Sequence, residues 1–475
     1  MVMGEFVQEC DLVVIGAGPA GYAAAFRAAD LGMDVTLVDT AEGPGGVCLF
    51  RGCIPSKTYL YLAELLHDAS RAPEMGITFG QPEIDIEGVR RWKRSVVEKL
   101  AGGLVQLSDG RGIQRIQGRA EFVSSTEIRI PGAEISGIRF QHAVIATGSR
   151  PIALPDTTFE KGGRIMSSTA ALGLPDVPRR MLVVGGGYVG LEIGMIYAAL
   201  GSEIHLVEMG DRLLPGIDED LVAPLRRRLD TAFGAIHLNT RVAEVKAREE
   251  DVEVVFSGDG EDPGGAFDRV LVAIGRSPNT RGLGLENTGV RTDESGFIRV
   301  DDRQRTDDEN IFAAGDVAGG MMLAHKASRE GKIAVEVIAG EPSAFDAAAI
   351  PAVVYTDPQI AYCGLTETEA SRENRPVEVQ RFPWKYSGRA ITMGTGEGLT
   401  KMVIDPESRR ILGVGIVGRD TEGLISEGVL AVEMGAVVED VALSIHPHPT
   451  LSETEAEAAE IFLGSATHVP PRKRG

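Results

Sequence analysis

One pattern occurs twice in this chain and restricts its fold more than any other feature. The apolar residues 11–15 are followed by the glycine-rich residues 16–21, a helical pattern, a second apolar run and Asp39. The same order returns between Met181 and Glu208, and the first glycine precedes the acid by 23 positions in both copies, 16 to 39 and 185 to 208. Strands that alternate with helices form parallel sheets. We therefore predict an α/β chain with two Rossmann-like domains.

Each glycine of the pattern has a separate structural task. The first permits a sharp turn, the second lets the backbone approach a pyrophosphate, and the third allows close packing of helix on strand. The N-terminus of the following helix attracts the phosphates, and the acid accepts hydrogen bonds from a ribose. The pattern therefore predicts two dinucleotide sites. Their residues are Gly16, Gly18, Gly21 and Asp39 in the first copy, and Gly185, Gly187, Gly190 and Glu208 in the second.

The acid of the second copy indicates which dinucleotide binds there. The Glu208 carboxylate accepts hydrogen bonds from a free ribose 2′-hydroxyl and repels a 2′-phosphate. Arg212 lies nearby in the sequence and is able to contact a phosphate, but the carboxylate opposes it. We predict NAD rather than NADP.

Two cysteines follow the first dinucleotide pattern. Cys48 and Cys53 are five positions apart, and residues about four apart approach each other on one helical face. Gly52 and Pro55 favour a local distortion that brings the sulfurs closer. This spacing predicts a redox-active disulfide; a metal half-site and a structural bridge are the alternatives. The other two cysteines supply no second metal-binding pair, and a loop this short gains little stability from a bridge. No metal is predicted.

Further segments carry candidate contacts to a flavin nucleotide. Residues 143–151 and 270–279 are similar strand-and-glycine segments. Residues 311–316 form another strand, which ends at Asp316, and this carboxylate is available to the polyol part of a flavin. A helix is predicted to begin at Ala324 with its N-terminus toward the flavin; the alternative is a solvated helix start.

Composition and charge exclude several classes of function. The chain has 475 residues and a formal net charge of −21, which disfavours nucleic-acid binding. Four cysteines do not suggest a secreted disulfide framework. The first ten residues lack the pattern of a signal peptide, so we predict a cytoplasmic protein. Residues 181–200 are apolar enough to imitate a membrane span, but their glycines indicate a buried strand, turn and helix instead.

The C-terminal part has a different pattern. Alternating segments at 401–404 and 411–417 predict strands, and residues 424–434 predict a helix. They are followed by a segment in which His448 lies between Pro447 and Pro449, and Glu453 comes after them. Such a pair is often only surface decoration, but prolines fix the backbone and suit a group that must be held in position.

Together these motifs resemble those of the flavin-dependent pyridine-nucleotide–disulfide oxidoreductases, over about residues 9–465. Residues 48–57 and 446–453 are the most specific parts of the resemblance. It implies an FAD-binding domain (1–152), an NAD-binding domain (153–278), a central domain (279–346) and an α+β interface domain that forms a homodimer (347–475). It further implies FAD contacts from Gly16, Gly18, Gly21, Asp39, Lys57, Ala120, Thr147, Asp316 and Ala324, and NAD contacts from Gly185, Gly187, Gly190, Glu192, Glu208, Val242 and Gly275.

The resemblance also implies roles for the catalytic residues. Cys48 matches the thiol that exchanges with substrate, and Cys53 matches the thiol that faces the flavin. His448 matches a base that serves the partner subunit, Glu453 the carboxylate that orients it, and Lys57 a cation that stabilises charge on the flavin. The implied reaction is oxidation of protein-bound dihydrolipoamide with NAD.

The implied partners are lipoyl domains and the E2 core of 2-oxoacid dehydrogenase complexes, or the H protein of glycine cleavage. The alternatives are an NADH-dependent reductase of another disulfide and a redox-dead FAD-binding subunit. The sequence departs from the family pattern at Val47, Phe50 and Arg51, where flavin packing is affected, and at Tyr188, which concerns access to the nicotinamide pocket.

Overall fold

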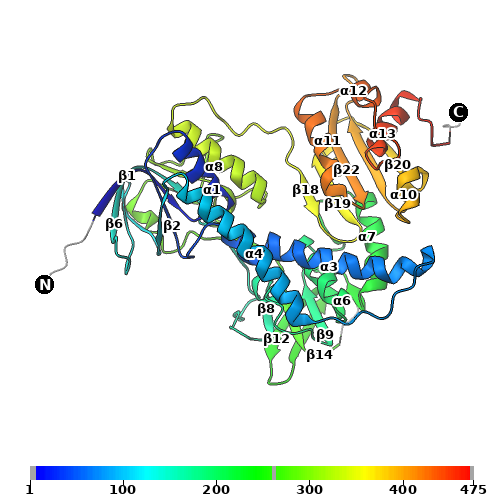
Figure 1. Ribbon diagram of the computed structural model, residues 1–475, viewed down its shortest axis with the longest axis horizontal. Helices are drawn as coiled ribbons and strands as arrows, with labels where there is room; N and C mark the ends of the chain where they lie inside the picture. Colours follow the sequence, from blue (N-terminus) through cyan, green and yellow to red (C-terminus); the bar gives the residue numbers. More distant parts are fainter. Residues whose placement is uncertain (1–6, 259–263, 471–475) are drawn as a thin grey trace.

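The computed structural model describes residues 7–258 and 264–470. Figure 1 shows two α/β bodies, formed by the N-terminal and central parts of the chain, and a third body formed by the C-terminal part. Three main sheets correspond to these bodies, with seven, five and five strands. The predicted repetition of the glycine pattern thus appears as two separate sheets.

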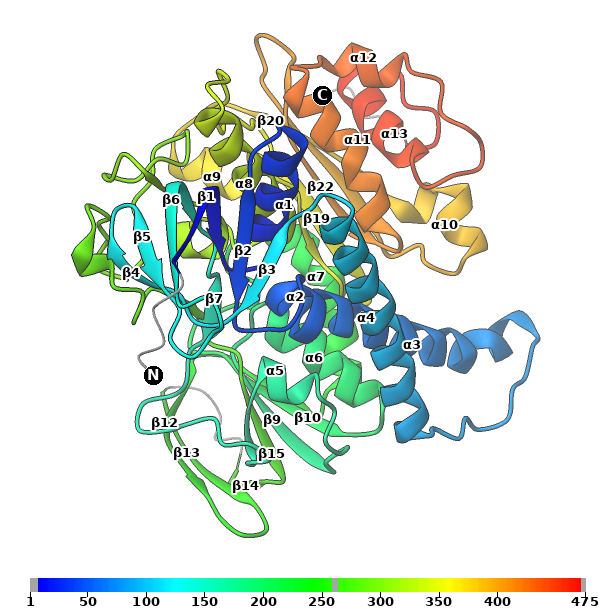
Figure 2. The same ribbon diagram turned by 60° about the vertical axis from the view of Figure 1, so that its left-hand side comes forward.

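The first sheet contains the first copy of the pattern. β1 pairs in parallel with β2 and β6, and β17 returns from much later in the chain to pair in parallel with β6. Helices α1 and α8 cover one face with small and branched apolar side chains (Figures 1 and 2). The elements are β3 (Gln114–Gln117), β2 (Val35–Asp39), β1 (Val7–Ile15), β6 (Gly137–Ile145), β5 (Glu127–Arg129), β4 (Glu121–Ser124), β17 (Ile311–Ala313), α1 (Pro19–Asp30) and α8 (Ala324–Ile338).

The second sheet contains the second copy and is parallel throughout. Its apolar side chains pack on α6 and α7 on one face and on a small antiparallel sheet, β12–β13–β14, on the other. The elements are β11 (Ala235–His237), β10 (Glu203–Val207), β9 (Arg180–Val184), β15 (Arg269–Val272), β8 (Ile165–Ser167), β12 (Thr240–Ala247), β13 (Val252–Gly258), β14 (Ala266–Phe267), α5 (Ser168–Ala171), α6 (Tyr188–Ala199) and α7 (Glu219–Ala232).

A third, antiparallel sheet forms the C-terminal body, where α11, α12 and α13 enclose the core. The elements are β18 (Ala352–Val354), β19 (Gln359–Gly364), β22 (Ile411–Gly418), β21 (Leu399–Ile404), β20 (Glu378–Pro383), α9 (Glu367–Arg372), α10 (Gly388–Thr392), α11 (Thr421–Glu433), α12 (Val438–Ala442) and α13 (Glu453–Leu463).

Two connections between these bodies matter for the site. The two similar segments noted in the sequence pair with each other as an antiparallel ribbon of β7 (Ser149–Pro151) and β16 (Arg276–Pro278). Between β2 and β3 the chain forms α2 (Gly46–Arg51), α3 (Cys53–Arg71) and α4 (Ile86–Asp109), and α3 extends between the second and third bodies (Figure 1).

Most predicted elements are present, with one correction. The first strand begins at Val7 rather than near Asp11, because it continues in register along β6. In α4, Trp92 is 54% exposed, since this helix packs mainly on α3 and leaves another face open. Residues 181–200 form β9, a turn and α6, as predicted. Within the described residues, no helix is long and apolar enough to cross a membrane.

Candidate active site

The two cysteines of the first body lie together at a break between two helices. Cys48 is in α2 and Cys53 is the first residue of α3, with Gly52 between the helices. A Cβ on Gly52 would approach the Val47 carbonyl oxygen to 3.0 Å, so glycine allows the close turn. Both cysteines are free thiols within hydrogen-bonding reach of each other. The structure therefore has the geometry of a reduced redox pair.

The pair is electrostatically asymmetric. The hydrogen bond from the Cys48 thiol, together with the charge of Lys57 and against the effect of burial, lowers the pKa of Cys53 to about 7. The same hydrogen bond and burial raise the pKa of Cys48 far above its usual range. The shared proton therefore stays on Cys48, and Cys53 is the thiolate near neutral pH.

Lys57 is held by a buried carboxylate. Its Nζ lies 2.8 Å from Oε2 of Glu192, a residue of α6 that is only 3% exposed. The other Glu192 oxygen accepts a hydrogen bond from the Tyr355 backbone N–H at 3.0 Å, and the Lys57 ammonium lies 4.3 Å from the centre of the Tyr355 ring. Side chains from all three bodies therefore fix the position of this cation.

The role of Lys57 gives a testable pH dependence. Replacing Lys57 by Met removes a cation and leaves Glu192 unpaired, and both changes disfavour the Cys53 thiolate. We expect the pKa of Cys53 in the reduced protein to rise by about 1 unit. Titration of the thiolate absorbance should show the midpoint moving upward from about 7. Lys93→Met on α4 is the matched control, and an unchanged midpoint in Lys57→Met would disprove the role.

Both glycine loops have a shape that fits a bound dinucleotide. Gly16 has φ +101°, and a Cβ there would lie 2.3 Å from the Ala146 carbonyl oxygen; a Cβ on Gly21 would lie 1.7 Å from the Gly16 carbonyl oxygen. A Cβ on Gly18 or Gly187 would meet nothing closer than 3.9 Å. The middle glycine of each loop is therefore not required by protein packing, and its open side leaves room for a ligand to approach the backbone.

The two acids hold their loops in the same way. Asp39 accepts hydrogen bonds from the backbone N–H groups of Ala17 and Ala41, at 2.6 and 2.7 Å. Glu208 accepts from those of Gly186 and Gly210, both at 2.7 Å. Each carboxylate keeps further lone pairs for a ribose. This repeated geometry supports binding of one dinucleotide at each loop.

One cavity joins the first glycine loop to the cysteines. Its volume is about 290 Å³. The predicted residues among its lining are Gly16, Gly18, Asp39, Cys48, Cys53, Lys57, Thr147, Glu192, Asp316 and Ala324. Residues that had been predicted from separate parts of the chain are thus brought into one space, with the thiols beside the first dinucleotide loop.

The remaining predicted contacts lie around the two loops. Ala120 is buried two residues after Gly118, whose N–H donates to the Asp39 carbonyl oxygen. In the second body, Val242 lies two residues after Thr240 on β12, and the Thr240 N–H donates to the Glu208 carbonyl oxygen. Gly190 packs beneath Gly185, and Gly275, at φ +125°, lies between β15 and β16, directly before β16.

Sequence reasoning missed part of the cavity wall. Arg276 donates hydrogen bonds to the side chain and the backbone carbonyl of Ser149, at 2.7 and 2.8 Å, and the Ser149 hydroxyl donates to Asp316. The Asn279 amide donates to the Thr147 carbonyl oxygen at 2.9 Å. The similarity of the two segments that form the β7–β16 ribbon was a signal for these residues, but it did not show that the segments pair.

The C-terminal histidine and glutamate also form a pair. His448 Nδ1 lies 2.8 Å from Glu453 Oε1, and the Thr450 N–H donates to Oε2 of Glu453 at 2.7 Å. Burial alone would raise the pKa of Glu453, but the hydrogen bonds from Thr450 and His448 hold it below its usual range. A carboxylate on Nδ1 leaves Nε2 free to accept a proton. The peptide bond between His448 and Pro449 is cis.

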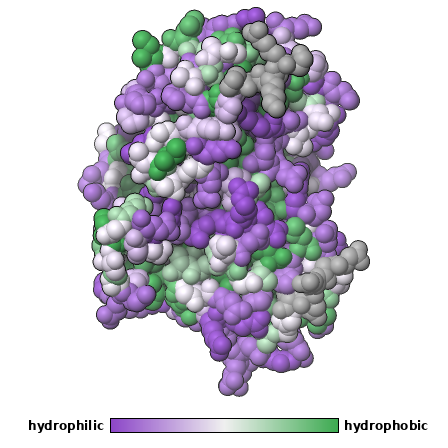
Figure 3. Space-filling view, turned by 90° about the vertical axis from the view of Figure 1, so that its right-hand side faces the viewer, coloured by the Kyte–Doolittle hydropathy of each residue, from purple (hydrophilic) through white to green (hydrophobic). Residues whose placement is uncertain are grey.

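His448 is not beside the cysteines of its own chain. Its side chain is 69% exposed, and it is absent from the described lining of the cavity that holds the thiols. Apolar side chains near it also face solvent, including Met434, Leu443 and Ile445, the last fully exposed. On the face shown in Figure 3, hydrophobic side chains form separate patches in a mostly hydrophilic surface. This part of the C-terminal body has the character of an interface.

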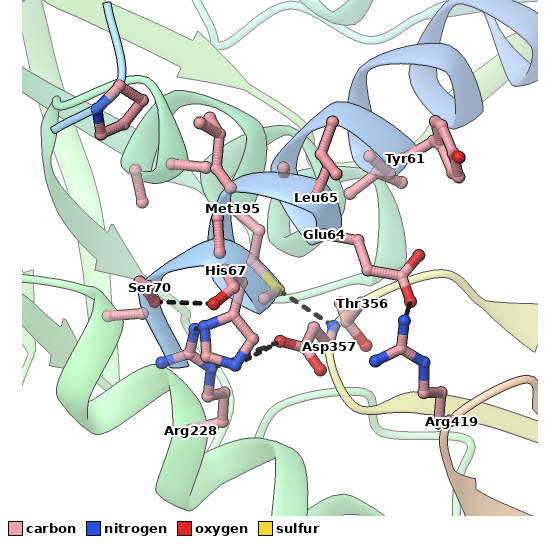
Figure 4. A pocket seen from close by; sticks show the side chains of 18 of the residues that line it. Tyr61, Glu64, Leu65, His67, Ser70, Met195, Arg228, Thr356, Asp357 and Arg419 are labelled. Atoms are coloured by element: carbon pink, nitrogen blue, oxygen red, sulfur yellow. Dashed lines mark hydrogen bonds and ion pairs between the residues drawn. The ribbon is translucent and has the colours of Figure 1, made fainter. Parts of the chain in front are cut away.

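A second, larger cavity of about 1140 Å³ runs along α3 (Figure 4). In it, Arg228 of α7 donates a hydrogen bond to His67 of α3 at 2.8 Å, and Arg419 forms a bidentate pair with Asp68 at 2.7 and 2.9 Å. The described lining contains neither redox cysteine. Its ion pairs instead fix α3, the helix that begins at Cys53, to the second and third bodies.

Comparison with known proteins settles the family. The profile described as pyridine nucleotide-disulphide oxidoreductase matches residues 10–331, and the dimerisation-domain profile of the same family matches residues 350–459. The chain belongs to the pyridine nucleotide-disulphide oxidoreductases. The resemblance recognised in the sequence and the predicted α/β fold are therefore confirmed.

Relatives and solved structures match nearly the whole chain. The dihydrolipoyl dehydrogenase of Vibrio cholerae is 45% identical over 468 residues, 98% of each chain, and that of Bacillus subtilis is 42% identical over 471 residues, 99% of this chain and all of the relative. LpdA of Mycobacterium tuberculosis has a TM-score of 0.88 at 28% identity, and the HOCl-induced flavoprotein disulfide reductase RclA of Escherichia coli 0.84 at 27%. Both solved structures match 95% of this chain, which covers 99% of each.

Membership of this oxidoreductase family has three direct consequences. The chain is a flavoprotein enzyme, and FAD and NAD are its cofactors, as predicted. The two glycine loops described above fit these nucleotides. The C-terminal body is a dimerisation domain, which supports the predicted homodimer.

Proposed function

We propose that this enzyme is a dihydrolipoyl dehydrogenase, which oxidises protein-bound dihydrolipoamide to lipoamide with NAD as the electron acceptor. The observation that carries the proposal is the thiol pair of Cys48 and Cys53 in the cavity of the first dinucleotide loop. The full-length identity of 45% to a relative of that name supports the choice of substrate. The direct test is the rate of NADH formation from dihydrolipoamide and NAD by the purified holoenzyme.

The first step is proton removal from the substrate. His448 of the partner subunit accepts the proton of one substrate thiol at Nε2, while Glu453 beside it stabilises the imidazolium that forms. The substrate thiolate attacks Sγ of Cys48 in the oxidised enzyme. The bond between Cys48 and Cys53 breaks, and Cys53 leaves as the thiolate.

The second step releases the product. The other substrate thiol loses its proton and attacks the substrate sulfur bound to Cys48, so lipoamide forms and Cys48 leaves and takes up the proton. The enzyme then holds the dithiol pair that the structure shows. FAD, when bound, supplies the electron relay from this dithiol to NAD. Lys57 stabilises the negative charge on Cys53 and would stabilise negative charge on a bound flavin.

We propose the residue roles and the domain limits that were predicted from the sequence. The limits are an FAD domain at 1–152, an NAD domain at 153–278, a central domain at 279–346 and an interface domain at 347–475. The three main sheets support the first, second and fourth of these, while β17 of the central range pairs within the first sheet. Because His448 and the cysteines of one chain do not share a cavity, the proposed active site combines Cys48 of one subunit with His448 of the partner subunit.

The proposed partners are lipoyl domains, with the E2 core of a 2-oxoacid dehydrogenase complex or the H protein of glycine cleavage, and the proposed location is the cytoplasm. These follow from the proposed substrate, because lipoamide is attached to such carriers. Affinity isolation of the enzyme from a cytoplasmic extract should recover a lipoylated protein. Recovery of the enzyme in another cell fraction would contradict the location.

The choice of NAD over NADP gives a separate prediction. Glu208→Ala should raise the KM for NAD by about tenfold, because the ribose loses its hydrogen bonds to a charged carboxylate. Discrimination against NADP should weaken as the repulsion of the 2′-phosphate disappears. Steady-state kinetics with both nucleotides measure the two effects. Equal use of NADP and NAD by the wild-type enzyme would contradict the argument from the carboxylate.

A second candidate is an NADH-dependent reductase of a different disulfide. It is supported by the similarity to RclA, a flavoprotein disulfide reductase. Rates with dihydrolipoamide and with glutathione disulfide distinguish the two functions. A redox-dead flavin-binding subunit would instead show no long-wavelength band when its thiols are reduced.

A further inference from the structure

A buried cation joins the NAD-binding body to the dimerisation domain. The side chain of Lys401 on β21 is 1% exposed, and its Nζ lies 2.7 Å from Asp218, 2.9 Å from Asp220 and 2.8 Å from Glu367. Arg381 on β20 also pairs with Asp220, at 2.6 Å, and with Glu367. Lys401 and Arg381 of the C-terminal sheet thus both pair with carboxylates of the NAD-binding body and of the dimerisation domain.

Asp218 has an unusual attachment for its position. It precedes α7 at the N-cap, where an aspartate normally accepts hydrogen bonds from its own helix. Its carboxylate instead accepts from the backbone N–H groups of Glu367 and Thr368 of α9, at 3.0 and 2.9 Å, while also facing Lys401. The beginning of α7 is therefore fixed to the dimerisation domain (Figure 1).

Packing reinforces this attachment. A Cβ on Gly415 of β22 would lie 2.5 Å from Leu221, which shows that the first turn of α7 rests directly on the C-terminal sheet. A buried ammonium is costly unless acceptors surround it, and buried carboxylates are equally costly when their cation is removed. The position of Asp218 therefore depends strongly on Lys401.

The segment before Asp218 leads to the NAD loop. Glu208 bonds to Gly186 and Gly210, and the Leu214 N–H donates to the Gly186 carbonyl oxygen at 3.1 Å. The side chain of Leu213 closes on Gly186, where a Cβ would lie 2.6 Å from it. The buried side chains in this segment are Leu213, Leu214 and Ile217. It is thus attached to the nucleotide loop at one end and to the Lys401 cluster at the other.

We propose that Lys401 is a positioning residue for NAD binding: by anchoring Asp218 to the dimerisation domain, it holds residues 208–218, and with them Glu208, in the geometry that NAD requires. The inference rests on the proposed function only in taking NAD to bind at Glu208. It goes beyond that function because Lys401 lies in another domain and contacts no predicted nucleotide-binding residue.

The test compares NAD binding in wild-type and Lys401→Met holoenzymes. Removing the cation should weaken NAD binding by about tenfold, a typical coupling between distant sites. The FAD content and the kcat at saturating NAD should stay close to wild type, because neither depends on residues 208–218. Calorimetric titration of the oxidised holoenzyme with NAD gives the dissociation constant, and steady-state kinetics separate KM from kcat.

Chemical rescue separates positioning from general stability. The carboxylate oxygens of Asp218, Asp220 and Glu367 lie within 4.8 Å of one another, close enough to share a metal ion. In Lys401→Ala, Ca²⁺ should therefore occupy the position of the ammonium and restore NAD affinity, while NaCl at equal ionic strength should not. Wild-type affinity should not respond to Ca²⁺.

Two further variants keep the inference testable. Glu367→Gln, at a partly exposed carboxylate, should weaken NAD binding in the same direction if the Lys401 variants do not fold. Arg419→Met is the matched control, because it removes another ion pair between bodies, the pair with Glu64 in Figure 4, that does not touch residues 208–218. Its NAD affinity should be unchanged.

The outcomes are distinguishable. Unchanged NAD affinity in Lys401→Met and Glu367→Gln, with only a lower melting temperature, would overturn the inference and leave the proposed function intact. An equal loss of affinity in Arg419→Met would also overturn it, because the effect would then be a general one. Failure of the wild-type holoenzyme to bind NAD would instead reject the proposed function.

Discussion

Cys48→Ser should reduce the oxidation of dihydrolipoamide by about a thousandfold or more, the scale expected when an essential reacting group is removed. Serine cannot form the disulfide, so the substrate thiolate has no sulfur to attack. The reduction of an artificial electron acceptor such as ferricyanide by NADH should persist, because it needs the two nucleotide sites but not the dithiol. Parallel assays of both reactions measure the contrast.

Cys10→Ala is the control for this experiment. Cys10 is a buried free thiol in β1, and the proposed exchange does not use it. Its variant should therefore keep both activities. Substantial dihydrolipoamide oxidation by Cys48→Ser would mean that another group accepts the substrate thiolate.

The second large effect is recovery of activity between two inactive variants. Cys48→Ser and His448→Gln should each be nearly inactive as homodimers. In a mixed dimer, one site combines both changes, and the other combines an intact Cys48 with an intact His448 of the partner subunit. A random equal mixture should therefore regain about a quarter of the wild-type activity, given a two-fold symmetric dimer.

Co-expression with two different affinity tags allows the mixed dimers to be isolated. Each isolated mixed dimer should have one working site. No recovery would show either that His448 acts on the cysteines of its own chain or that the dimer is arranged differently. Mixing Cys48→Ser with Cys53→Ser is the control, since one lesion in the thiol pair would remain in every site.

Several features of this protein could be predicted from the sequence because they depend on short-range geometry. A turn with positive φ at Gly16 and a close approach at Gly21 require glycine whatever surrounds them. The spacing of Cys48 and Cys53 places the thiols on adjacent helical turns. The bonded pair of His448 and Glu453 is also five positions apart. Each of these relations joins residues at a short, fixed spacing, so it can be recognised in the sequence.

Other features were decided only by tertiary structure. The pairing of Lys57 with Glu192 joins residues 135 positions apart, and Lys401 meets Asp220 across 181 positions. The exposure of Trp92 was also set by which elements pack on its helix. No periodicity records these relations, because a buried charge is satisfied by whichever partner the packing of separate domains places beside it. The sequence by itself thus determined the nucleotide loops and the reactive groups, while domain packing decided how they are held, since only the folded chain brings distant charges within reach of each other.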